Sequence, residues 1–570
     1  MAHYPPITQI KTWTLHRQTE RKPSPPIFVL VNLRHLRILF HSGYCLDQFS
    51  SYDCRRNQTQ RNSMPSPKTQ PARGMRDFLP ADVRKREYVI GIIKEVYERY
   101  GFEPLETPAV ENIETLMGKY GEEGNQLIFK ILKRGEHEKS GEADLALRYD
   151  LTVPLARVVA QYQNELPKFF KRYQIQPVWR ADRPARGRFR EFYQCDVDVL
   201  GSRSMIVEAE LISAASDALE ALGFNDFTIR VNHRNILTAV LNASNIPPAI
   251  HSAVLIGLDK YDKNPGSLTE AMANIGVPYE SGLKFLTFLL ENVTRFKDLV
   301  SRAQEAASRQ IADATTVEEL DVVDFSRLFM DANESLLDRI AGFTFPSLAA
   351  EKAIEDVRKV LQLAENRTKP RRVFLDLTLA RGLSYYTGTI MEMNVADLPG
   401  SLGGGGRYDN LVGMFSKQSI PACGFSLGLE RIITVMNERK MFPLSVVGSP
   451  ADLMVASFDD ESQPVAFTFA AELRAQGLRV LLHPESGNPG KHRVYARDRG
   501  IPFMIVIGEN ERQTGQLILV EPRIRGGQQL PKNEIVSAIR QRLEEKKKER
   551  EMEDKTFADA IKQERDKADQ

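Results

Sequence analysis

Cysteine is scarce in this chain of 570 residues, and its spacing argues against two kinds of site. The four cysteines are Cys45, Cys54, Cys195 and Cys423, and no two of them form a CxxC pair. This scatter argues against a zinc site and against a disulfide scaffold, and it suits a reducing compartment.

Long apolar runs and an excess of one charge are also missing. The most apolar candidate, residues 27–40, is interrupted by polar and basic side chains and is too short to cross a membrane, so no membrane partner is expected. The net charge of +2 means that any nucleic-acid binding must come from local patches. A hydrophobic content of 42% is that of a globular protein, and the length allows three or four domains.

The first 70 residues are basic and poor in acid, with ten Lys and Arg against three Asp and Glu. Such a leader resembles an organelle transit peptide. The alternatives are a disordered tail, or a segment upstream of a later start at Met64 or Met75. We therefore expect the protein in the cytoplasm, in mitochondria, or in both.

Residues 172–201 read RYQIQPVWRADRPARGRFREFYQCDVDVLG and predict a β-hairpin with a cationic tip. Apolar-rich runs at 173–179 and 192–200 flank a loop rich in arginine. The loop arginines are Arg180, Arg183, Arg186, Arg188 and Arg190.

The second of these runs alternates in polarity, which predicts a half-buried strand. Its polar face holds Gln194, Asp196 and Asp198, and its apolar face holds Cys195, Val197 and Val199. Arginines at one end and carboxylates along the floor suit a substrate that is anionic at one end and cationic at the other. A solvated hairpin is the alternative.

Three further stretches carry candidate chemistry. Asp150 and Thr152 follow a strand end, where a turn or cap role for Asp150 competes with a site role. The glycines at 403–406 allow close approach to a ligand or form a flexible turn, and no Walker or Rossmann pattern surrounds them. Arg431 is expected near a helix N-terminus, against the helix dipole, which favours an anionic ligand over a surface ion pair.

The remaining periodicity predicts the framework. An amphipathic helix is expected at 82–100, a second helix at 204–222, and a mostly helical insertion at 233–369. Strands resume at 373. After a linker, strands and helices alternate from 452 to 545, which predicts a small α/β domain, and a charged tail follows.

With these stretches in view, residues 71–545 resemble the histidyl-tRNA synthetases, a family of class II aminoacyl-tRNA synthetases. The segment up to Pro108 resembles the first class II motif, which forms a dimer interface, the hairpin resembles the second, and residues 424–431 resemble the third. Two histidine-specific peptides are matched by RGLSYY at 381–386 and GGGRYD at 404–409. The Tyr149-Asp150 pair resembles the eukaryotic type.

The resemblance implies roles for individual residues. Arg180 would contact the ATP α-phosphate and the histidine carboxylate, Arg381 would lie beside the α-phosphate, and Arg431 would bind the γ-phosphate. Arg180 and Arg381 are the implied catalytic residues. The implied histidine-binding residues are Asp150, Thr152, Arg180, Gln194, Asp198, Arg381, Tyr385 and Tyr386. Ser384 departs from the family, which usually has an acidic residue there, and this puts histidine binding or activity in doubt.

The resemblance also implies an α+β fold, with an antiparallel sheet flanked by helices rather than a doubly wound parallel sheet. The implied domains are a leader at 1–70, catalytic core at 71–232 and 370–440, an insertion at 233–369, an anticodon-binding domain at 451–545 and a tail at 546–570. The basic residues expected on a phosphate-contacting face of that domain are Lys491, His492, Arg493, Arg497 and Arg499.

The implied activity is ATP-dependent ligation of L-histidine to tRNA(His) through an adenylate, by a homodimer that binds Mg²⁺ with ATP. No metal-ligating protein residue can be assigned. The competing hypothesis is a catalytically inactive relative that serves as a regulatory subunit or a tRNA sensor. The C-terminal domain, which regulatory subunits usually lack, and the absence of a kinase pattern weigh against it.

Overall fold

The computed structural model describes residues 69–135, 140–261, 266–313, 325–365, 372–380, 385–416, 418–443, 446, 448–549 and 552. Several sequence predictions fall outside these ranges. They concern the leader up to residue 68 with Cys45 and Cys54, the signature residues Arg381 and Ser384, and the tail from 553.

An eight-stranded sheet organises the catalytic part, in the order β1-β5-β6-β11-β10-β9-β7-β8. The strands are β1 (Glu103–Pro104), β5 (Phe170–Trp179), β6 (Glu191–Leu200), β7 (Thr228–His233), β8 (Val373–Leu375), β9 (Thr389–Asn394), β10 (Ser401–Arg407) and β11 (Ala422–Gly428). All pairs are antiparallel except β1 with β5 and β7 with β8 at the edges. The predicted hairpin and the predicted antiparallel sheet are confirmed.

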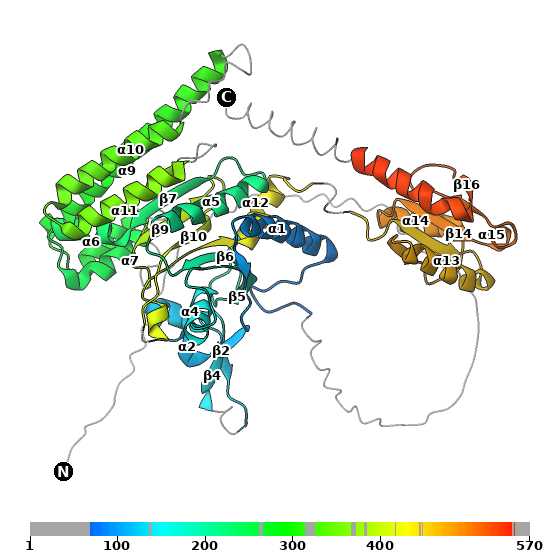
Figure 1. The fold of residues 1–570 in the computed structure, drawn as a ribbon, viewed down its shortest axis with the longest axis horizontal. Coiled ribbons are helices and arrows are strands. Elements are labelled where there is room, and N and C mark those ends of the chain that lie inside the picture. Colours follow the sequence, from blue (N-terminus) through cyan, green and yellow to red (C-terminus); the bar gives the residue numbers. More distant parts are fainter. Residues whose placement is uncertain are drawn as a thin grey trace, which may run out of the picture. The chain divides into compact units, whose positions relative to one another are not determined.

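Helices cover one face of this sheet through a continuous apolar core. They include α1 (Pro80–Arg99), α5 (Ile206–Ala221) and α12 (Leu429–Glu438), which lie together over β6 and β11 (Figure 1). The apolar face of β6 enters this core, since Cys195 and Val197 are fully buried. The predicted helix at 82–100 is confirmed. Pro80 suits its first turn, and Gly101 follows it at φ +74°.

A smaller layer packs beside the end of β5. It comprises α4 (Thr152–Gln161), α2 (Ile113–Leu116), α3 (Gly121–Gln126) and a three-stranded sheet of β2 (Val110–Asn112), β4 (Ala143–Leu147) and β3 (Lys130–Leu132). A second apolar cluster joins Val153 and Leu155 of α4 to Phe170 of β5 and Leu200 of β6. This layer fixes the segment that carries Asp150 and Thr152.

The helical segment between β7 and β8 is a crossover connection. These two strands pair in parallel, and a parallel pair cannot be joined by a tight turn. The connection contains α6 (Arg234–Ala243), η2 (Pro248–Ile250), α7 (His251–Asp259), α8 (Gly266–Asn274), α9 (Tyr279–Asp313), α10 (Phe325–Thr344) and α11 (Leu348–Glu365). Leu337 and Val357 of these helices are fully buried in the main core.

The C-terminal domain has its own sheet and core. Parallel strands β12 (Leu453–Ser457), β13 (Val480–Leu482) and β14 (Phe503–Ile507) pair in the order β13-β12-β14, next to α13 (Gln463–Ala475) and α14 (Pro489–Asp498). The predicted α/β domain is confirmed. The sequence reading missed α15 (Glu509–Thr514) and β16 (Gln528–Pro531), which pairs with β15 (Gln516–Leu519). Short 3-10 turns are η3 (Val412–Met414), η4 (Asp460–Ser462) and η5 (Lys532–Glu534), and a helix covers 535–549.

Within the described ranges, no helix combines the length and the apolar character that a membrane crossing needs.

A buried ion pair ties the glycine-rich strand to the helix layer. Arg407 of β10 donates to both carboxylate oxygens of Glu208 on α5, at 2.6 and 2.7 Å. Glu208 is completely buried and Arg407 is 5% exposed. Arg407 belongs to the GGGRYD peptide, so its side chain holds that peptide against α5.

Glu208→Leu should lower the free energy of unfolding by about 3–5 kcal/mol, because the buried Arg407 guanidinium loses the carboxylate that it binds through two hydrogen bonds and keeps only the longer ion pair with Asp409. Glu210→Leu on the same helix is the matched control. Glu210 pairs with Lys171 while 33% exposed, so its loss should cost only about 0–1 kcal/mol. Denaturant unfolding of both variants measures the difference, and equal losses would contradict the assigned role of Glu208.

Candidate functional site

A cavity of about 500 Å³ is lined by residues of β6, β10 and β11 and by the start of α12. Its size falls within the usual range for small-molecule sites. All predicted site residues that the structure describes line this cavity. They are Asp150, Thr152, Arg180, Gln194, Asp198, Tyr385, Tyr386 and Arg431. Asp259, at the end of α7, lines it too, although no motif in the insertion had indicated any chemistry there.

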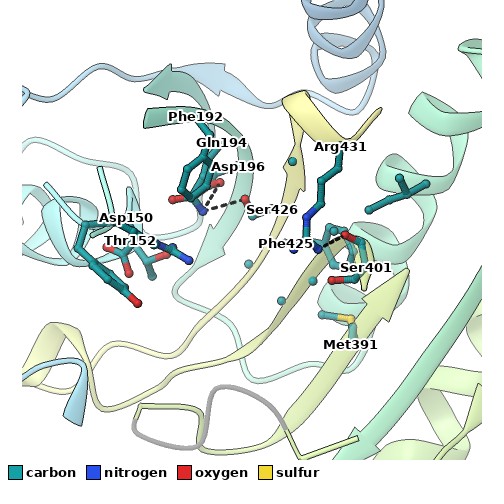
Figure 2. A pocket seen from close by; sticks show the side chains of 18 of the residues that line it. Asp150, Thr152, Phe192, Gln194, Asp196, Met391, Ser401, Phe425, Ser426 and Arg431 are labelled. Carbon is teal, nitrogen blue, oxygen red and sulfur yellow. Dashed lines mark hydrogen bonds between the residues drawn. The ribbon is translucent and has the colours of Figure 1, made fainter. Parts of the chain in front are cut away.

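Acidic and basic side chains both line the cavity. Figure 2 shows Asp150 and Thr152 on one side and Arg431 with Ser401 on the other, and Gln194, Asp196 and Ser426 lie between them. Carboxylates and arginines are therefore both available to the predicted substrate, which carries opposite charges at its two ends. The solvated-hairpin alternative is wrong for the polar face of β6, because Gln194, Asp196 and Asp198 are only 8%, 2% and 2% exposed.

The four glycines form part of β10 in the middle of the sheet, so the flexible-turn alternative is wrong. Three of them, at 403–405, line the cavity. A Cβ on Gly405 would lie 2.0 Å from the carbonyl oxygen of Gly424, and a Cβ on Gly424 would lie 1.9 Å from Asp198 Oδ1. Side chains are therefore excluded from this part of the floor, which leaves room for the acidic groups of β6.

Asp198 is held by a cation that sequence reasoning missed. Arg172 of β5 is fully buried, and its Nη2 lies 2.8 Å from Asp198 Oδ2. The two residues face each other in the hairpin register. Burial raises the pKa of Asp198, while Arg172 and a hydrogen bond donated by Tyr408 oppose that shift. Arg172 lies just before the apolar-rich run 173–179 that predicted the first strand, so that pattern did not include it.

Asp150 makes the contact with a helix start that the sequence left open as one alternative, and it also reaches the cavity. Its Oδ1 accepts a hydrogen bond from the backbone N of Val153 in the first turn of α4, at 3.0 Å, and another from the Tyr120 hydroxyl, at 2.9 Å. Burial raises the pKa of this carboxyl group, whereas the Val153 amide and nearby Arg180 lower it. Asp150 is thus fixed by the helix and also lines the cavity.

The Arg180 guanidinium is fixed in orientation by aromatic neighbours. It lies 4.3 Å from the ring centroid of Tyr149 and 5.2 Å from that of Phe192. Its Nε donates to the Tyr149 carbonyl at 2.9 Å. A planar cation held in this way presents its donors in a fixed direction.

Arg431 is the third residue of α12, near the helix start as predicted. Its Nη1 donates to the Ser401 carbonyl at 2.5 Å. A Cβ on Gly187 of the hairpin loop would lie 3.3 Å from Arg431 Cγ, so the loop packs directly on this side chain. The neighbouring Glu430 instead makes a buried pair with Arg86 of α1 at 2.7 Å.

The loop arginines do not act as one cluster. Arg180 and Arg188 line the cavity. Arg186 pairs with Glu438 at the end of α12, Arg188 pairs with Asp182 at 2.7 Å, and Arg183 is exposed.

Tyr385 and Tyr386 complete the cavity wall, with ring centroids 4.7 Å apart. Arg234 Nη1 donates to the Tyr386 carbonyl at 2.8 Å, which ties this segment to the start of α6.

In the C-terminal domain, one predicted surface residue is misplaced. His492 is 3% exposed, and its ring packs on His483 with centroids 4.4 Å apart, so it is not on a phosphate-contacting face. Arg493 donates to the Pro522 carbonyl at 3.0 Å. Lys491, Arg497 and Arg499 are exposed, as expected.

The antiparallel sheet, its bare glycine floor and the arginines around the cavity are those of a class II aminoacyl-tRNA synthetase. Residues 74–432 match the family model "Histidyl-tRNA synthetase", and residues 450–542 match "Anticodon binding domain". The chain belongs to the histidyl-tRNA synthetase family.

Individual relatives agree over most of the chain. The chain is 40% identical to the histidine–tRNA ligase of Gloeobacter violaceus over 484 residues, which cover 80% of this chain and 95% of that protein. It is 38% identical to that of Cytophaga hutchinsonii over 460 residues, covering 78% and 93%. These relatives are bacterial, so they do not confirm the eukaryotic type.

Solved structures share the fold. The histidyl-tRNA synthetase of Nostoc sp. PCC 7120 superposes with a TM-score of 0.63 at 28% identity, covering 83% of this chain and 99% of that one. An ATP phosphoribosyltransferase regulatory subunit/histidyl-tRNA synthetase from Bacillus halodurans has a TM-score of 0.58 at 21% identity, covering 78% and 100%, and shows the fold alone.

Asp196 makes the stability of the protein depend on pH. Burial raises its pKa from 3.8 to about 7, with Arg172 opposing and Asp198 adding to the shift. Between these two values the folded protein holds more protons than the unfolded chain. The free energy of unfolding therefore falls as pH rises from about 4 to about 7, and this contribution levels off above that.

Asp196→Asn should remove that contribution, because an amide does not ionise. Denaturant unfolding at a series of pH values between 4 and 8 should give a flatter profile for the variant than for the wild type. Parallel profiles would contradict the raised pKa of Asp196.

Proposed function

We propose that this chain joins L-histidine to tRNA(His) at the cavity described above, through a histidyl-adenylate. As a member of its family it is an ATP-dependent histidine–tRNA ligase. The observation that supports the assignment of the site is the cavity itself, which is lined by buried carboxylates and by the arginines Arg180 and Arg431.

The first step needs no general base, because the carboxylate of histidine is already ionised at neutral pH. A carboxylate oxygen attacks the α-phosphorus of ATP, the bond to the bridging oxygen breaks, and its electron pair leaves with pyrophosphate. Arg180 holds the carboxylate and the α-phosphate together and stabilises the charge that develops there. Arg431 binds the γ-phosphate and so orients the leaving group.

In the second step, a ribose hydroxyl of the terminal adenosine of the tRNA attacks the carbonyl carbon of the adenylate, and AMP leaves. The phosphate contacts of Arg180 again stabilise the leaving group. The C-terminal domain binds the anticodon part of the tRNA.

Histidine is recognised by paired polar contacts. We assign its ammonium and imidazole groups to Asp150, Thr152, Gln194, Asp198 and the two tyrosines, Tyr385 and Tyr386. A site built from such groups rejects an analogue that lacks the matching donors by roughly 10⁴-fold or more, so no editing domain is needed.

Arg381 remains a proposed catalytic residue beside the α-phosphate, and a proposed histidine contact. Ser384, in the same peptide, remains a proposed cause of weaker histidine binding or activity. Both rest on the family pattern, since they lie outside the described residues.

Mg²⁺ fits this site as an ion carried by ATP. Within the described ranges, no group of three or more His, Cys, Asp and Glu side chains could hold a metal ion. Mg²⁺ at nucleotide sites is commonly held by substrate phosphates with few protein ligands. Bound in this way, it neutralises phosphate charge.

The finer assignments are also proposals. We propose a homodimer built through the first motif, the domain boundaries given above, a eukaryotic-type signature at Tyr149-Asp150, and a transit function for the basic leader. A cytoplasmic location, a mitochondrial one or both are likewise proposed, and the bacterial relatives offer no support for the mitochondrial one.

Histidine-dependent ATP–pyrophosphate exchange tests the function. The protein should exchange pyrophosphate with histidine and not with other amino acids. A folded protein that binds tRNA without exchange would instead support the inactive relative.

Arg180→Ala should reduce this exchange by about 10²–10³-fold, because it removes the donors held at the reacting phosphate. Arg381→Ala should abolish it. Arg183→Ala is the matched control, since Arg183 is exposed in the same loop and should leave the rate unchanged. Equal effects of Arg180→Ala and Arg183→Ala would refute the assignment of Arg180.

Lys491→Ala should weaken tRNA binding and lower the slope of log K against log salt by about 1, because one phosphate contact is lost. Filter binding at several salt concentrations measures the slope. An unchanged slope would remove Lys491 from the proposed phosphate-contacting face.

A further inference from the structure

The side-chain amide of Gln194 is held in one orientation by Ser426 and Asp196, two residues that are not among the proposed histidine contacts. The Gln194 amide nitrogen Nε2 donates to Ser426 Oγ at 2.9 Å and to Asp196 Oδ1 at 3.4 Å (Figure 2). Its oxygen Oε1 is buried and accepts no hydrogen bond from any described residue. An acceptor in this state has lost its contact with water without gaining a partner.

Ser426 and Asp196 are directly opposite each other on neighbouring strands, β11 and β6. Their side chains hydrogen-bond, and the hydroxyl group of Ser426 is the donor, because this bond lowers the pKa of Asp196 and therefore stabilises its ionised form. The oxygen of Ser426 is then left as an acceptor toward Gln194. The Gln194 amide must therefore turn its NH₂ group to Ser426 and its oxygen away from it.

We propose that Ser426 and Asp196 are positioning residues that hold the Gln194 amide with its oxygen presented to the donor groups of bound histidine. This inference rests on the proposed function, in which Gln194 contacts the substrate. It adds two residues that act through Gln194 and do not touch the substrate themselves.

The two residues have separable effects. Without the Ser426 hydroxyl, the amide loses its main acceptor at 2.9 Å. Without the Asp196 carboxylate, the hydroxyl is free to rotate and can donate to the amide oxygen, so both orientations of the amide become accessible. Either change lowers the fraction of the protein that is ready to accept a hydrogen bond from histidine, which raises KM for histidine.

The test uses steady-state pyrophosphate exchange with the full chain. Ser426→Ala and Asp196→Ala should each raise KM for histidine by about 3–10-fold, the loss of one hydrogen bond, while kcat and KM for ATP change by less than about 2-fold. Ser426→Thr retains the hydroxyl and should restore a KM close to that of the wild type. A packing role for Ser426 predicts the opposite order, because the added methyl group would then disturb the site more than alanine does.

A double-mutant cycle with Gln194→Ala tests whether Ser426 acts through Gln194. If Ser426 acts through Gln194, Ser426→Ala should have no further effect on KM for histidine in the Gln194→Ala background. Full additivity of the two substitutions, or an unchanged KM in Ser426→Ala, would overturn the inference. If Gln194→Ala itself leaves KM for histidine unchanged, the proposed contact between Gln194 and histidine fails instead, and the two failures are thereby distinguished.

Discussion

The ion pair between Arg172 and Asp198 is the interaction on which the site depends. Three carboxylates, Asp150, Asp196 and Asp198, are buried along one cavity, and burial alone would drive each of them to the neutral form. Arg172 lies at 2.8 Å from Asp198 and at 4.0 Å from Asp196, and is itself fully buried. Removal of this one cation would leave the acidic floor without its internal counter-charge.

The β-hairpin connects this interaction to the rest of the fold. One face of β6 packs into the core beneath α1 and α5, and the other face lines the cavity. A shift of one residue in the register would exchange these two faces. The fit of β6 to the apolar core therefore also determines which side chains reach the substrate.

The sequence was sufficient to predict the hairpin, the antiparallel sheet and the eight described cavity residues, because period-two alternation and motif order are local signals. It was not sufficient for the partners across strands. Arg172, Ser426 and Glu208 act through register and helix packing, which a single strand pattern does not reveal. The glycine run was ambiguous for the same reason. Glycine is common in turns because of its backbone freedom, but it also occurs in strands where a neighbouring strand leaves no space for a side chain. The prediction for His492 was wrong because it assumed that a basic side chain is exposed.

The order of the strands also constrains how the protein is made. In the sheet, β6 lies beside β11, although roughly 220 residues separate the two along the chain. At a synthesis rate of about 5–20 residues per second, β6 waits on the order of ten to forty seconds before β11 leaves the ribosome. During that time β6 presents an open strand edge, and such an edge readily pairs with other chains. The catalytic sheet therefore closes late in synthesis, and until then the nascent hairpin needs protection from aggregation.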